Sequence, residues 1–334
     1  MVKRNRKCPH CGELISDNSL IVCPFCAENI STKNTNLILY ASKIGVFSKA
    51  KFTILALLSL VICIVVIVIY KYYMLNSLQG IISMGLKYFD SFETYTMENA
   101  DPNTVDKAYF LANKGISKYS DNDMLYAIKG YAAWLKCKDK YYNSELSRHQ
   151  IITNELYNES RKLTDQALNI NPNNFLALQT YAEYYSIAHE DYNKAIEYIN
   201  KAIKANPKYE QLYCIRAFIN IKRGKIYDVT EDINTAIKYA PQKGMYYGYR
   251  ASIKSTQGDL SAALKDANKS IKLNPNIPSL YLNRAIIEEQ KENYSDALKD
   301  CNRAIEILKK KNDAFSLLVI KEYEQYKENI ISKM

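Results

Sequence analysis

Residues 206–217 read NPKYEQLYCIRA, residues 240–251 read APQKGMYYGYRA and residues 274–285 read NPNIPSLYLNRA. The three segments align at a spacing of 34 residues, and each ends with Tyr, two further residues, Arg and Ala. Prolines extend the period toward the N-terminus, with spacings of 35, 34 and 34 residues between Pro172, Pro207, Pro241 and Pro275. A period near 34 indicates helix-turn-helix units that stack into a solenoid.

Four residue types recur with this period: Tyr213, Tyr247 and Tyr281; Arg216, Arg250 and Arg284; Ala217, Ala251 and Ala285; and Asp232, Asp266 and Asp300. The pattern YxxRA, then a turn and a helix ending in A-I-x-x-x-P, resembles the tetratricopeptide repeat (TPR) family. The resemblance implies an all-α fold, a TPR-like solenoid in which small alanines let paired helices approach closely. It implies packing roles for the tyrosines, and the recurring Arg and Asp are expected to form a salt-bridge ladder between repeats.

The chain is expected to contain six segments: a zinc ribbon (1–30), a basic linker (31–51), a transmembrane helix (52–73), membrane-proximal helices (74–122), TPR repeats (123–311) and a capping helix (312–334). Clear repeats cover residues 175–208, 209–242, 243–276 and 277–310. An earlier, longer unit precedes them, with residues 136–155 as an expansion.

A membrane span is predicted from Phe52 to Tyr70, where the chain has no charged residue, Pro or Gly. A helix over this stretch would be about 28 Å long, the thickness of the bilayer hydrocarbon. A buried core helix is the alternative. Lys33, Lys43, Lys49 and Lys51 precede the span, whereas only Lys71 and Lys87 follow it closely, which favours a cytoplasmic N-terminus and an extracytoplasmic repeat region. The lone Cys137, Cys214 and Cys301 oppose this, because free thiols are uncommon in oxidising compartments.

Two cysteine pairs lie near the N-terminus, in CPHCGELI (8–15) and CPFCAENI (23–30). Two such CxxC turns can complete a tetrahedral Cys₄ shell around one structural Zn²⁺, with Cys8, Cys11, Cys23 and Cys26 as ligands. The pairs resemble the bacterial zinc ribbon, except that Ala27 stands where the second turn usually has Gly. His10 as a ligand and a redox CxxC motif are the weaker alternatives.

The TPR resemblance also implies a binding surface on the inner face of the stack. We call its predicted members the groove set: Gln179, Cys214, Phe218, Ile221, Met245, Ser252, Leu282 and Ile286. Their mixed, partly apolar character would suit an amphipathic or extended protein segment. The carboxylate-reading specificity of some chaperone-binding repeats is rejected, because of its required residues only Asn283 fits.

Half of the formal charge of +10 lies in residues 1–51, and the basic and acidic side chains of the long body nearly cancel, so the body does not have the character of a nucleic-acid-binding protein. His10, His149 and His189 have no motif partners, and no catalytic motif is present, so the chain is not expected to be an enzyme. The favoured function is a membrane-anchored scaffold or adaptor for protein-protein interaction. The alternatives are an envelope sensing or assembly component that recognises a peptide or glycan, and a membrane-tethered nucleic-acid-binding zinc ribbon. The oligomeric state stays open.

Overall fold

The computed structural model describes residues 6–7, 14–15, 59–69, 77–90, 102–142, 146–225, 229–311 and 314–334. The chain divides into two compact units, residues 1–72 and residues 73–334. We describe each unit by itself.

The first unit contains a small sheet and a helix. Strands β1 (Arg6–Lys7) and β2 (Leu14–Ile15) pair antiparallel, with Arg6 opposite Ile15 and Lys7 opposite Leu14. Residues 59–69 are helical, and their large apolar side chains are about half exposed. No helix among the described residues has both the length and the apolar character to cross a membrane. The rest of the predicted span, 52–58 and 70–73, lies outside the described residues.

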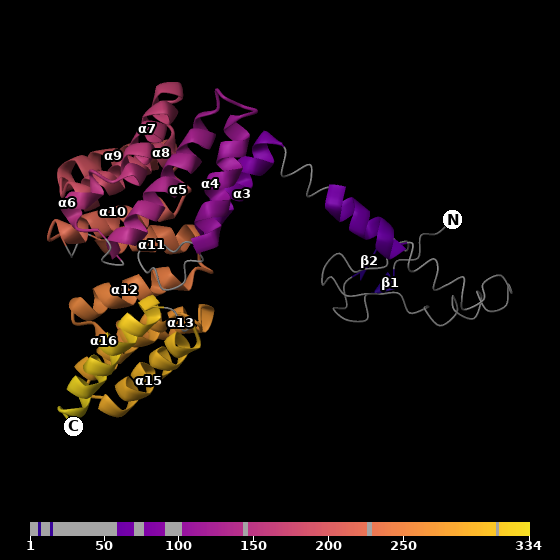
Figure 1. The fold of residues 1–334 in the computed structure, drawn as a ribbon. Coiled ribbons are helices and arrows are strands. Elements are labelled where there is room, and N and C mark those ends of the chain that lie inside the picture. Colours follow the sequence, from indigo (N-terminus) through magenta and orange to yellow (C-terminus); the bar gives the residue numbers. More distant parts are fainter. Residues whose placement is uncertain are drawn as a thin grey trace. The chain divides into compact units, whose positions relative to one another are not determined.

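The second unit is built from helices in its described residues, and Figure 1 shows them in sequence order from indigo to yellow. They are α3 (Leu78–Asp90), α4 (Pro102–Ile116), α5 (Asp123–Tyr142), α6 (Arg148–Ile151), α7 (Glu155–Ile170), α8 (Phe175–Glu183), the π-helix η2 (Tyr184–Ala188), α9 (Tyr192–Ala205), α10 (Gln211–Lys222), α11 (Thr230–Tyr239), α12 (Gly244–Thr256), α13 (Leu260–Leu273), α14 (Pro278–Gln290), α15 (Tyr294–Lys311) and α16 (Ala314–Ile331).

Consecutive helices pack in pairs that coincide with the repeats expected from the sequence. The pairs are α8 with α9, α10 with α11, α12 with α13, and α14 with α15, and we call the first helix of a pair the A helix and the second the B helix. The longer unit upstream pairs α5 with α7, and the short α6 lies within the predicted expansion. The prediction of an all-α, TPR-like solenoid is confirmed for this unit, and α16 packs against α15 at its end.

The turns between A and B helices explain one part of the period. Glu190, Gly224, Gly258 and Glu292 follow one another at intervals of 34 residues, and all four have a positive φ, from 54° to 85°. Glycine adopts this left-handed conformation without strain, whereas a residue with a Cβ does not. All four repeats therefore have a left-handed residue at this turn, and in two of them that residue is not glycine.

The π-helix η2 explains why one interval between prolines is 35 and not 34. Ala182 and its counterpart Ala217 are 35 residues apart, whereas Glu190 and Gly224 are 34 apart. The extra residue therefore lies between Ala182 and Glu190, where η2 replaces α-helix. A π-turn accommodates one inserted residue in a helix without shifting the residues on either side.

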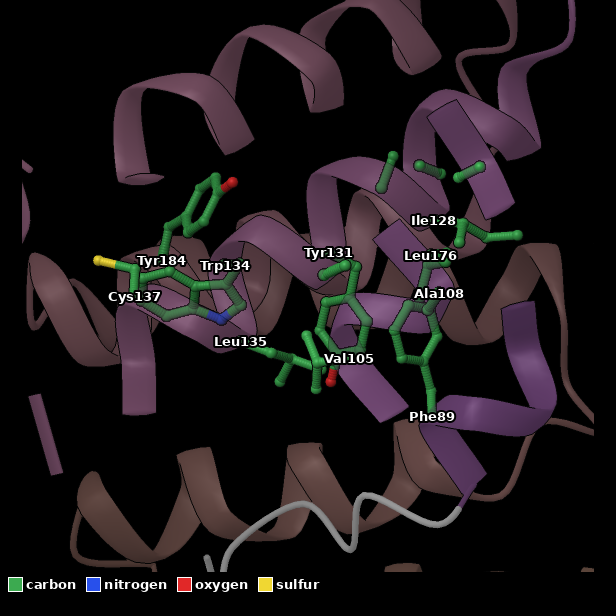
Figure 2. Close-up of a cluster of buried hydrophobic side chains, with 14 of the residues drawn as sticks. Phe89, Val105, Ala108, Ile128, Tyr131, Trp134, Leu135, Cys137, Leu176 and Tyr184 are labelled. Atoms are coloured by element: carbon green, nitrogen blue, oxygen red, sulfur yellow. The ribbon is translucent and has the colours of Figure 1, made fainter. Parts of the chain in front are cut away.

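The largest buried side chains lie at the N-terminal end of this unit. Figure 2 shows Phe89 of α3, Tyr131 and Trp134 of α5, and Tyr184 of η2 in one cluster. The ring of Phe89 meets Tyr131 edge-on at a centroid distance of 4.9 Å, and Trp134 meets Tyr184 in the same way at 4.9 Å. Since α3 and α4 contribute to the same core as α5 and α8, the helices before the predicted first repeat extend the stack.

Candidate functional site

The recurring Arg residues connect three helices each. Arg250 of α12 donates from Nε and a terminal nitrogen to the two carboxylate oxygens of Asp266 on α13, both at 2.8 Å. Its other terminal nitrogen donates to Asn234 of α11, also at 2.8 Å. Arg216 and Arg284 make the equivalent contacts, with Asp232 and Asn200 and with Asp300 and Asn268.

These contacts correct the expected ladder in one respect. The ion pair joins the two helices of a single repeat, and the guanidinium reaches the preceding repeat through a hydrogen bond to the uncharged side chain of Asn. The carboxylate accepts both bonds of the planar guanidinium fork, a geometry that Lys cannot reproduce.

The recurring tyrosines have a structural role, consistent with the packing role implied for them. The hydroxyls of Tyr213, Tyr247 and Tyr281 donate to the carbonyls of Pro207, Pro241 and Pro275, at 2.9, 3.1 and 2.9 Å. Each bond ties the A helix to the Pro turn that precedes it. The guanidinium groups of Arg216 and Arg250 lie 5.6 and 5.5 Å from the ring centroids of Tyr213 and Tyr247.

The first clear repeat replaces this motif with aromatic residues. Tyr181 occupies the position that Arg216 has in the next repeat and hydrogen-bonds to Asp165. Its ring stacks with Tyr198, and Tyr198 stacks with Tyr185 at a centroid distance of 5.4 Å. At the end of η2, the hydroxyl of Tyr157 contacts Nε2 of His189 at 2.8 Å.

The groove set lies entirely on A helices but is not uniformly accessible. Gln179, Cys214 and Met245 are buried, so their side chains offer no surface to a partner in this structure. Cys214 packs with the core of α10 and α11, and Met245 packs with Ile277 and Leu280. Ser252 and Ile286 are exposed, and Phe218, Ile221 and Leu282 are partly buried.

Three members of the groove set are equivalent by the repeat period: Phe218 of α10, Ser252 of α12 and Ile286 of α14. Phe218 packs edge-on against Tyr249 at a centroid distance of 5.0 Å, and Ile286 is 38% exposed. Ile221 lies one turn after Phe218, and residues three apart share a face of a helix. Three successive A helices thus present accessible side chains at matching positions.

Asn283 is engaged within the fold. Its side-chain nitrogen donates to the backbone carbonyl of Gly248 at 2.8 Å, which joins α14 to α12. A Cβ at Gly248 would lie 2.9 Å from a methyl group of Leu280, so glycine permits this close approach. These contacts accord with the rejection of a carboxylate-reading role for Asn283.

The inner positions of the two upstream A helices form a buried polar cluster. The carboxylate of Glu183 accepts hydrogen bonds from the Tyr131 hydroxyl at 3.1 Å, the Trp134 indole at 2.9 Å and the Lys138 ammonium at 3.0 Å. Gln179 donates to the same carboxylate at 3.2 Å, while its own carbonyl oxygen is buried without a partner. The Lys138 and Glu183 side chains are 3% and 2% exposed. The side chains at these upstream inner positions therefore contact one another and are not accessible to a partner.

The sequence predicted Gln179 as an inner position but not the cluster that it forms with Glu183. Trp134 and Lys138 are four residues apart and share a helix face with Tyr131, which marks one side of the cluster. The acceptor lies 45 residues beyond Lys138 and has no distinguishing local pattern. The irregular interval of 35 residues did signal the neighbouring π-helix.

The predicted zinc ligands Cys8, Cys11, Cys23 and Cys26 lie outside the described residues. Within the part of the chain that the structure describes, no group of three or more His, Cys, Asp and Glu side chains could hold a metal ion. Cys63, Cys137, Cys214 and Cys301 are free thiols, and the last three are buried. Burial raises the pKa of the Cys137 and Cys301 thiols to about 11, which keeps them protonated and poorly reactive at neutral pH.

Comparison with known proteins supports the repeat assignment. Residues 177–209 match the family model for the tetratricopeptide repeat, which spans most of the first clear repeat and the first residue of the next. A search of curated proteins finds no match.

Several solved structures resemble this chain, to different degrees. The APC/C hetero-tetramer Cut9–Hcn1 is 12% identical, with a TM-score of 0.50 over 74% of this chain and 46% of that one. PilF of Pseudomonas aeruginosa is 10% identical, with a TM-score of 0.48 over 75% and 97% of the two chains. YrrB, described as a TPR protein with an unusual peptide-binding site, is 18% identical, with a TM-score of 0.40 over 63% and 97%. Because the other two TM-scores are below 0.5, only the likeness to Cut9–Hcn1 bears on this chain, and at 12% identity it concerns the fold alone. TPR-like solenoids present extended surfaces on which they assemble other proteins.

Proposed function

We propose that this chain is a membrane-anchored scaffold that binds a segment of a partner protein along the A helices α10, α12 and α14. The observation that supports this most is the repetition of accessible side chains at equivalent positions, Phe218, Ser252 and Ile286. Two accessible apolar side chains with a small polar one between them suit an amphipathic helix or an extended peptide. The proposal needs no catalytic group, and we propose that the chain is not an enzyme.

The upstream A helices are excluded from this proposed surface. Their inner positions are occupied by the buried cluster around Glu183, which would have to open before a partner could enter. Opening it would expose a buried ion pair and four hydrogen bonds, at a cost of several kcal/mol. The partner segment is therefore proposed to contact the three downstream repeats.

The experiment is affinity capture with the full chain in detergent, comparing wild type with Phe218→Ala plus Ile286→Ala. A matched control, Phe110→Ala plus Ile170→Ala, removes two exposed apolar side chains outside the groove set. Loss of two partly buried apolar contacts should reduce the retained partner by about tenfold or more. The control should retain as much partner as wild type. Equal capture by the groove variant would contradict the proposed surface.

The anchor is proposed to be a helix over residues 52–73 with the N-terminus in the cytoplasm. Its support is the uncharged run from Phe52 to Tyr70, together with the exposed apolar side chains of residues 59–69. The lone thiols no longer oppose an extracytoplasmic repeat region, because Cys137, Cys214 and Cys301 are buried and shielded from oxidants. Protease added to intact spheroplasts should digest the repeats and spare the N-terminal 50 residues. The reverse pattern would overturn the orientation.

The N-terminus is proposed to bind one structural Zn²⁺ through Cys8, Cys11, Cys23 and Cys26. The pairing of β1 with β2 supports this, because Lys7 and Leu14, which flank the first CxxC pair in sequence, lie opposite each other. Short antiparallel pairing beside a CxxC turn is compatible with a zinc ribbon. Metal analysis of the full chain should find one zinc per chain, and Cys23→Ser should lose it. A stoichiometry well below one would contradict the site.

A further inference from the structure

A pocket of about 520 Å³ lies between α9, α10 and α11, away from the groove set. Its lining includes Tyr213, Arg216, Asn220, Glu231, Asp232 and Thr235. Because the chain repeats itself, the next repeat shows which side chains can stand at the equivalent positions and what they bind.

In the next repeat, lysines stand at two of these positions. Lys254 replaces Asn220, and its ammonium donates to Asp266 at 2.7 Å. Lys269 replaces Thr235, and its ammonium lies 5.8 Å from the ring centroid of Tyr247. Elsewhere in the stack the position of Thr235 also holds a cation, Lys201 one repeat earlier and Arg303 two repeats later. The repeat with the pocket is thus the one of the four clear repeats that has no cation at either position.

The acceptor that binds Lys254 is preserved in the pocket. Oδ2 of Asp266 accepts from both Arg250 Nε and Lys254, whereas Oδ2 of Asp232 accepts the equivalent bond from Arg216 at 2.9 Å. A carboxylate oxygen has two lone pairs, so Asp232 can accept a second charged donor in the manner of Asp266. Burial alone would raise the pKa of the Asp266 carboxyl, but its bonds to Arg250 and Lys254 hold the pKa below its ordinary value.

The charges around the pocket favour the same occupant. The pocket lining has two guanidinium groups, Arg216 and Arg223, and two carboxylates, Glu231 and Asp232. The equivalent positions of the next repeat hold four cations, Arg250, Lys254, Lys265 and Lys269, against the single carboxylate of Asp266. Arg223 is directed to Asn193 and Asn220 by hydrogen bonds at 3.1 and 3.3 Å. Relative to the equivalent positions of the next repeat, the pocket has two fewer cations and one more carboxylate.

We propose that this pocket binds a lysine side chain supplied by a partner protein, in the place that Lys254 takes in the next repeat. The ammonium group hydrogen-bonds to Asp232 and its methylene stem lies along the pocket wall that includes Ile196 and Tyr213. This site lies between A and B helices and is independent of the groove set, so a partner can engage it whether or not the groove is used.

The test uses the full chain in detergent and immobilised Gly-Ser peptides that contain a single lysine, or norleucine at the same place. Wild type should be retained on the lysine peptide about tenfold more than on the norleucine peptide, as expected for one charged hydrogen bond. Asn220→Lys should fill the pocket from within and abolish this preference. Asn302→Lys, at an exposed position of α15, adds the same charge elsewhere and should leave the preference unchanged.

A gain of binding provides the converse test. Lys254→Asn plus Lys269→Thr should open a second pocket in the next repeat and raise retention on the lysine peptide. The proposal is overturned if wild type does not distinguish lysine from norleucine, or if Asn220→Lys binds the lysine peptide as wild type does. A loss with Asn302→Lys equal to that with Asn220→Lys would also overturn it, since net charge and not the pocket would then explain binding.

Discussion

At the scale of single residues, the turn between A and B helices has a residue with positive φ, and in two repeats this residue is not glycine. Glu292 has a φ of 62°, at the position where Gly258 has 85° and Gly224 has 78°. A left-handed residue with a Cβ is strained by about 1–2 kcal/mol. Replacing it with glycine removes this strain, but the greater conformational freedom of glycine in the unfolded chain offsets part of the gain in stability.

Glu292→Gly should therefore stabilise the chain slightly, by about 0.5 kcal/mol, and Gly258→Ala should destabilise it by about 1 kcal/mol. The second change tests the backbone alone, because a Cβ at Gly258 would meet nothing within 4 Å. Denaturant midpoints of the two variants, measured beside wild type, check both signs. If Gly258→Ala leaves the denaturant midpoint unchanged, the positive φ at this turn does not limit stability.

Glu183 and Lys138 pose a different residue-scale question, since each is buried with an opposite charge beside it. Lys138→Met should destabilise by about 3–5 kcal/mol, because it leaves the carboxylate buried without a cation. Lys138→Met plus Glu183→Leu removes both charges and should recover part of that loss, although Tyr131 and Trp134 then lose their acceptor. Thermal melting of both variants gives the result, and a double variant much less stable than Lys138→Met would contradict the account.

At the scale of elements, η2 shows how one extra residue is absorbed without disturbing the stack. Deleting Ser186 should convert η2 to regular α-helix and leave Ala182 and Glu190 in their places, with little change in melting temperature. Deleting Asn220 from α10, which has no π-turn, should rotate the residues that follow by about 100° and strongly destabilise the repeat. Circular dichroism melting separates the two cases. Equal destabilisation would show that η2 is not an insertion of one residue.

The elements also show why the sequence predicted some features and not others. The period of 34 residues and the recurring alanines defined the helix pairs, because alanines recur where A and B helices pack together. Position in the repeat identified the face of each A helix on which a residue lies. It did not identify how deeply the side chain is buried, because neighbouring helices determine that. Cys214 and Met245 are therefore buried although their register is that of an inner face. Three of the four partners of Glu183 come from a helix 45 or more residues away, a pairing that no local pattern encodes.

At the scale of the whole molecule, two stretches of one solenoid differ in the accessibility of their inner positions. The upstream repeats are closed at their inner positions by the Glu183 cluster, and the downstream repeats present Phe218, Ser252 and Ile286. A solenoid distributes its stability among neighbouring repeats, so changes at accessible positions should alter recognition without unfolding the chain. Stability and binding are therefore expected to be separable in the downstream repeats.

The most direct measurement is photo-crosslinking in living cells from a benzophenone amino acid at Ser252. Ser261, an exposed residue of the B helix in the same repeat, is the matched control. The account predicts a discrete crosslinked product from position 252 that is absent from position 261, and its loss when Phe218→Ala and Ile286→Ala are added. Crosslinking from position 261 alone, or from position 252 with no dependence on Phe218 and Ile286, would contradict it.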